Sequence, residues 1–144
     1  MTLFNDAEQQ QITDAIAKAE KNTSGEIRIC VEKNCKEEVL DRAAKYFYQL
    51  SMEKTKLRNG VLIYLATVDR KFAIIGDAGI NKVVPADFWD CTKDEMLEQF
   101  KHGNLVEGII AGITRAGEKL GTFFPGQPDD VNEISNDVAF MDGD

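Results

Sequence analysis

Two apolar runs that are separated by only four residues constrain the fold of this chain more than any other feature. The first run is VLIYLAT (61–67), the second is FAII (72–75), and VDRK (68–71) joins them. A connection this short allows only an antiparallel hairpin, because parallel strands need a crossover of a dozen or more residues. Since the first run is apolar without alternation, it predicts a central strand that is covered on both faces.

A third strand is predicted at EIRICVE (26–32), where apolar and polar residues alternate. One of its faces is partly polar, so we expect it to lie toward an edge of the sheet. A helical pattern over 37–52 separates it from strand 61–67. These two strands can therefore run parallel, joined by a right-handed crossover.

Three more segments have helical periodicity, namely 5–21, 84–103 and 105–121. Pro85 suits the first turn of the second segment. The last segment contains three spaced glycines, which we expect to let a neighbouring helix approach closely: Gly108, Gly112 and Gly117. The pattern predicts an α/β fold, a three-layer α/β/α sandwich with a small mixed sheet and helices on both faces.

The length of 144 residues fits one domain, which we place at residues 1–125. Residues 126–144 are expected to form an acidic C-terminal tail that is partly or wholly flexible. Much of the net charge of −8 comes from this tail, because 129–144 contain six acidic residues and no Lys or Arg. No basic stripe occurs elsewhere, which argues against a nucleic-acid partner.

No apolar run reaches the roughly 20 residues that a bilayer-spanning helix needs, so we expect no membrane insertion. MTLFNDAEQQQ at the N-terminus lacks the basic start and apolar core of a signal peptide. These features predict a cytoplasmic protein. GDAG (76–79) lacks both the G-x-G-x-x-G and the GK[ST] patterns, so no nucleotide is expected.

The topology collects candidate metal ligands at the end of the sheet where strands 26–32 and 61–67 begin, which we call the amino edge. The hairpin reverses direction, so the end of strand 72–75 reaches the same edge. The first-choice ligands lie here: Asp77, Glu26, Asn59 and Asp87. A structural alternative is open for Asp77, which can pair with Arg58 or Lys82.

The opposite end of the sheet, where the parallel strands finish, is the carboxyl edge. It receives Glu32, Asn34 and the second-choice ligands, Asp41 and Asp69. Carboxylate and amide oxygens suit Ca²⁺ and Mg²⁺, although neither edge has the EF-hand pattern. The structural alternatives are a helix start for Asp41 and a tight turn for Asp69.

Several segments together resemble the TPM domain family, also called the TPM phosphatase family. These are TSGEIRICVE, RNGVLIYLATVDRKFAIIGDAGI, FWD and the late NEIS, and the resemblance runs to about residue 135. It implies a Rossmann-like α/β/α sandwich, Ca²⁺ or other divalent-ion binding, and acid phosphatase activity as associated with a plant thylakoid member. The chain would be a short, stand-alone cytoplasmic member.

Three functions therefore stay open. The first is a divalent-cation-binding domain that holds Ca²⁺ or Mg²⁺. The second is a weak metal-dependent acid phosphatase on small phosphoesters, in which Arg58 or Arg70 would contact the phosphate and the catalytic residues are unknown. The third is a protein-interaction module without catalysis, which would use a protein partner.

Overall fold

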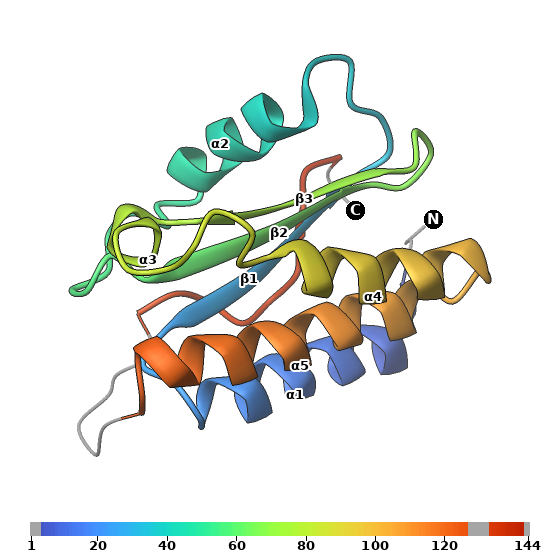
Figure 1. Cartoon of the computed structure of the whole chain (residues 1–144). Helices are drawn as coiled ribbons and strands as arrows, with labels where there is room; N and C mark the ends of the chain where they lie inside the picture. The colour runs from blue at the N-terminus through green and yellow to red at the C-terminus, as the bar shows by residue number, and fades with distance from the viewer. Residues whose placement is uncertain (1–3, 127–132, 143–144) are drawn as a thin grey trace.

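A computed structural model of the chain describes residues 4–126 and 133–142. Its centre is a four-stranded mixed sheet in the order β3-β2-β1-β4, with helices on both faces (Figure 1). The strands are β1 (Glu26–Glu32), β2 (Gly60–Ala66), β3 (Lys71–Gly76) and β4 (Ala139–Phe140). This arrangement confirms the predicted α/β fold.

The strand directions follow the prediction from connection lengths. β1 pairs with β2 in parallel, from Glu26 opposite Gly60 to Glu32 opposite Ala66. β2 pairs with β3 antiparallel, as the four-residue connection requires. The expectation that β1 lies toward an edge is corrected in part, because β4 pairs with its outer side at Cys30 and Val31.

The helices are α1 (Asp6–Glu20), α2 (Val39–Gln49), α3 (Ala78–Asn81), α4 (Asp90–Lys101) and α5 (Leu105–Phe123). In Figure 1, α2 covers one face of the sheet, and α1, α4 and α5 cover the other. Among the described residues, no helix is both long enough and apolar enough to cross a bilayer.

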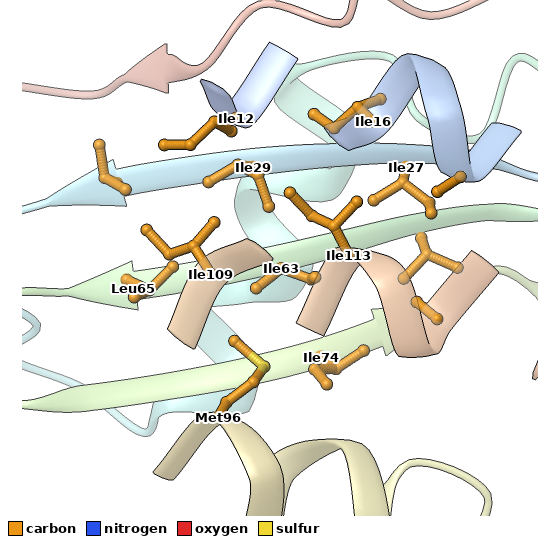
Figure 2. Close-up of a cluster of buried hydrophobic side chains, with 14 of the residues drawn as sticks. Ile12, Ile16, Ile27, Ile29, Ile63, Leu65, Ile74, Met96, Ile109 and Ile113 are labelled. Atoms are coloured by element: carbon orange, nitrogen blue, oxygen red, sulfur yellow. The ribbon is translucent and has the colours of Figure 1, made fainter. Parts of the chain in front are cut away.

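Strand β2 is buried along its whole length because both of its faces meet helices. Alternate residues such as Ile63 and Leu65 belong to the larger core, together with side chains of α1, α4 and α5 (Figure 2). The intervening Leu62 and Tyr64 belong to a second core beneath α2. The continuous apolar run was therefore interpreted correctly as a central strand.

The predicted start of helix 84–103 is wrong, since α4 begins only at Asp90. The residues before it form two tight turns, in which Phe88 N donates to the carbonyl oxygen of Pro85 and Asp90 N donates to that of Asp87. Pro85 thus opens a turn rather than the helix. A short extra helix, α3, directly follows β3.

Part of the predicted tail lies against the body of the protein. Ile134 N donates to Glu26 Oε1 over 2.6 Å, and Met141 N donates to the carbonyl oxygen of Val31 over 2.9 Å. Ile134 is 6% exposed. The rest of that prediction, at 127–132 and 143–144, lies outside the described residues.

Candidate functional site

At the amino edge, the carboxylate of Asp77 is held by an arginine. Arg58 Nε lies 2.8 Å from Asp77 Oδ2, and Arg58 Nη2 lies 2.8 Å from Oδ1. Oδ1 also accepts from Ala78 N over 2.7 Å, so Asp77 caps α3. Asp77 is 4% exposed, and its hydrogen bonds, followed by its charge, raise the pKa of Arg58. The structural alternative for Asp77, a pair with Arg58, is the one observed.

The GDAG turn packs directly against the loop that carries Arg58. Gly79 N donates to the carbonyl oxygen of Arg58 over 2.9 Å. A Cβ atom at Gly79 would lie 2.3 Å from the carbonyl oxygen of Leu57, a distance that no side chain tolerates. Glycine is therefore required here for the close approach of two backbone segments.

Glu26 and Asn59 are brought together by the first register pair of β1 and β2. Glu26 N donates to the carbonyl oxygen of Asn59, while Glu26 Oε1 accepts from Ile134 N. Glu26 Oε2 is buried and has no hydrogen-bond partner among the described residues. Burial raises the pKa of Glu26 to about 7.

The nearby Glu20 was not predicted as a member of this edge. It accepts a hydrogen bond from Ile27 N over 2.9 Å, and burial raises its pKa to about 7. Asp87 is exposed in the turn before α4, and its side chain makes no hydrogen bond or ion pair with any described residue. The amino edge thus combines a neutralised Asp77, a protonatable Glu26 and a separate Asp87.

At the carboxyl edge, Asp69 lies exposed on the turn between β2 and β3. Its Oδ1 accepts from Asn34 Nδ2 over 3.0 Å and its Oδ2 from Cys35 N over 2.7 Å. These hydrogen bonds, that from Asn34 first, hold the pKa of Asp69 below its ordinary value. No ion pair to Asp69 occurs within the described part of the chain.

A third segment reaches the same place from the C-terminal part of the chain. Lys33 N donates to Asp142 Oδ2 over 2.6 Å, while the carbonyl oxygen of Lys33 accepts from Val68 N and Asp69 N. Asp69 and Asp142 therefore bind backbone amides that are two residues apart, Cys35 N and Lys33 N. The sequence showed Asp142 only as part of an acidic tail, with no signal for where it docks.

The other two acidic residues of the carboxyl edge differ from Asp69. Glu32 is buried and accepts from Arg42, Tyr46 and Tyr64. Burial alone would raise the pKa of Glu32, but these donors together lower it. Asp41 lies exposed in the first turn of α2, where its charge suits the helix dipole.

Within residues 4–126 and 133–142, no three His, Cys, Asp or Glu side chains are grouped closely enough to hold a metal ion by themselves. A cation at the carboxyl edge would therefore use Asp69 and Asp142 together with amide oxygens, backbone carbonyls and water.

Comparisons with known proteins agree with the fold and its extent. The TPM domain model matches residues 1–119. The NMR structure of BA42 protein from the psychrophilic bacterium Bizionia argentinensis is 47% identical, with a TM-score of 0.91 over 96% of each chain. The N-terminal domain of a P. gingivalis protein shares the fold at 20% identity, with a TM-score of 0.68 over 85% of this chain and 79% of that one. No curated protein matches the chain.

Proposed function

This chain belongs to the TPM domain family, and from that premise we propose that it is a divalent-cation-binding domain that holds Ca²⁺ or Mg²⁺ at its carboxyl edge. The observation that carries the proposal is the state of Asp69. Its carboxylate is exposed, its pKa is lowered, and its hydrogen-bond donors within the described chain are neutral. The charges of Lys71 and Lys36 also lower this pKa, but neither side chain forms an ion pair with Asp69 within the described residues, so the carboxylate can still contact a cation.

Two other hydrogen-bonded carboxylates at the ends of the sheet, unlike Asp69, are paired with an arginine. Asp77 is neutralised by Arg58, and Glu32 by Arg42. The neutral donors around Asp69 fix the direction of the carboxylate without cancelling its charge, as outer-shell partners of metal ligands do. Each Asp69 oxygen accepts one hydrogen bond and keeps a second lone pair for an ion.

Asp142 and Asn34 supply the additional oxygens in this proposal. Asp142 contributes a second carboxylate beside Lys33, and the amide of Asn34 donates through Nδ2, which leaves Oδ1 for a cation. Asp41 at the start of α2 is a more distant contributor. With so few protein ligands, water completes the coordination, and we expect weak binding on the order of 10⁻⁴–10⁻³ M.

Calorimetric titration with CaCl₂ and MgCl₂ tests this proposal. We expect saturable binding that weakens at least about tenfold in Asp69→Asn, because a charged ligand becomes neutral. The matched control is Asp77→Asn, the same substitution at the amino edge, which should leave the Kd unchanged. Equal weakening in both variants, or no heat up to millimolar ion, would refute the proposal.

The two alternative functions draw less support from the geometry. For a phosphatase, Arg58 is one of the two candidate phosphate contacts. Its Nε and Nη2 atoms already donate to the two carboxylate oxygens of Asp77. Arg70 is exposed and makes no ion pair with any described residue. For an interaction module, the outer side of β1 is partly covered by the chain's own residues, since Arg28 Nε donates to the carbonyl oxygen of Asp137.

A further inference from the structure

A cavity of about 530 Å³ lies where the turn between β2 and β3 meets the junction of α4 and α5. Its volume falls in the range of small-molecule sites, roughly 300–1,000 Å³. The lining comes from the end of β2, the start of β3, the last turns of α4 and the start of α5. The lining residues that a ligand would use are Arg70, Lys71, Phe72, Leu97, Phe100 and Lys101.

The apolar part of this lining is substantial. The rings of Phe72 and Phe100 meet edge to face, with centroids 5.2 Å apart. Leu97 also lines the cavity and is 41% exposed, so its apolar side chain is open to a ligand. These three residues offer a surface on which an apolar group would lose contact with water.

The charged part of the lining has one sign. Arg70, Lys71 and Lys101 line the cavity and no acidic residue of the described ranges does, although the whole chain has a net charge of −8. Arg70 and Lys101 make no ion pair or side-chain hydrogen bond with any described residue. Lys71 reaches only the carbonyl oxygen of Cys35, at 3.4 Å, and helps to lower the pKa of Asp69.

We propose that this cavity binds a small amphiphilic carboxylate. The carboxylate group lies against Arg70 and Lys101, and the apolar body lies against Phe72, Leu97 and Phe100. Guanidinium and ammonium groups recognise a carboxylate through charge-assisted hydrogen bonds. The apolar side chains favour this ligand over inorganic phosphate, which would contact only the positively charged side chains. This ligand has the opposite charge to the cation proposed at Asp69 and contacts different side chains, although Arg70 follows Asp69 directly in the sequence.

The test is a ¹⁵N chemical-shift titration of the full chain with octanoate below its micelle concentration, in metal-free buffer. We expect saturable shifts confined to the amides of 65–72 and 97–105. Two matched probes separate the contributions of the carboxylate and of the alkyl group. 1-Octanol has the same number of carbon atoms as octanoate but no charge, and inorganic phosphate has a negative charge but no alkyl group. Both should bind at least about fivefold more weakly than octanoate.

The second part of the test removes the positive charges of Arg70 and Lys101. In the double variant Arg70→Gln/Lys101→Gln, octanoate should bind about tenfold more weakly while the shifts with 1-octanol stay as they are. Lys54→Gln, which removes an exposed charge outside the cavity, should change neither. The ¹⁵N spectrum of each variant reports whether it is folded.

Three results of the ligand titrations would overturn the proposal. They are equal affinity for octanoate and 1-octanol, equal affinity for phosphate and octanoate, and unchanged octanoate binding in the double variant. Shifts that grow with protein concentration without ligand would assign the cavity to a second copy of the chain, and would also overturn it.

Discussion

At the scale of single residues, Asp69 and Asp77 show how the same side chain acquires different roles. Both follow apolar strands, and both were candidate ligands. Asp77 meets a guanidinium and a helix start, whereas Asp69 meets an amide and a backbone N–H. The sequence offered Arg58 as one partner for Asp77, but could not decide between that ion pair and a cation, because the two residues are 19 positions apart and only the fold brings them together. Arg58 also has a left-handed backbone, with φ of 51°.

We predict that Asp77 contributes to stability rather than to metal binding. Asp77→Asn keeps a capping side chain but loses the charge opposite Arg58, and should lower the free energy of unfolding by about 1–2 kcal/mol. Asp77→Ala loses the cap as well and should lower it by about 2–4 kcal/mol. Urea unfolding measures both values.

The matched control for that series is Asp87→Asn. This residue is exposed and has no side-chain partner among the described residues, so the change should stay within about 0.5 kcal/mol. If Asp77→Asn and Asp87→Asn behaved alike, the ion pair with Arg58 would not contribute to stability.

At the scale of secondary-structure elements, the spaced glycines of α5 explain how three helices cover one face of the sheet. A Cβ at Gly117 would lie 2.7 Å from Ala19 Cβ and 3.1 Å from the Ala19 carbonyl oxygen on α1. A Cβ at Gly112 would lie 2.5 Å from Met96 Sδ on α4. The predicted role of these glycines, close approach of a neighbour, is confirmed.

We predict that Gly117→Ala destabilises the protein although alanine is the better helix former. The clash involves the α1 backbone, which cannot move alone, so the cost of about 1–3 kcal/mol exceeds a propensity gain of at most about 1 kcal/mol. In the paired variant Gly112→Ala, the obstacle is a flexible methionine side chain, and the loss should be smaller. Thermal unfolding measures both variants. A Gly117→Ala protein as stable as the parent would contradict this account of α1–α5 packing.

Most elements were predictable from periodicity, but the start of α4 and the existence of β4 were not. Pro85 and the aromatic residues after it fit a helical pattern, but residues 85–90 form tight turns closed by hydrogen bonds from Phe88 N to Pro85 O and from Asp90 N to Asp87 O. β4 has only two residues, too few for any alternation to be visible. Its pairing depends on contacts across more than 100 residues, such as that between Arg28 and Asp137.

At the scale of the whole molecule, Glu20 and Glu26 make stability depend on pH. Burial raises both pKa values from 4.5 to about 7. Between pH 4.5 and about pH 7, the folded protein therefore binds more protons than the unfolded chain does. The stability that the two groups contribute is fully present below pH 4.5 and is lost as the pH rises through 7.

We predict that the double variant Glu20→Gln/Glu26→Gln flattens this part of the pH profile. Glutamine keeps an oxygen for Ile27 N and Ile134 N but does not ionise. Between pH 5 and 8, the parent should lose about 1–3 kcal/mol more of its unfolding free energy than the variant does. Urea unfolding at several pH values gives both curves, and parallel curves would show that these carboxylates ionise as freely in the folded protein as in the unfolded chain.

The overall architecture follows from a few local patterns, but the site does not. The hairpin, the parallel crossover and the helix-covered central strand were all predictable, since connection length and apolar patterning determine them. Asp142 belongs to a segment whose composition indicates only a charged tail. It joins Lys33 because the chain returns along β1 after α5, which no local pattern encodes.

A ¹⁵N chemical-shift titration of the full chain with Ca²⁺ shows whether an ion binds to Asp69 and Asp142 at the carboxyl edge. If the ion binds at the carboxyl edge, the largest shifts occur at the amides of 33–35, 67–70 and 141–142, and Asp69→Asn removes them. Largest shifts at 57–60 and 76–79 would place the ion at the amino edge. That result, or an unchanged spectrum at millimolar Ca²⁺, would contradict binding at the carboxyl edge.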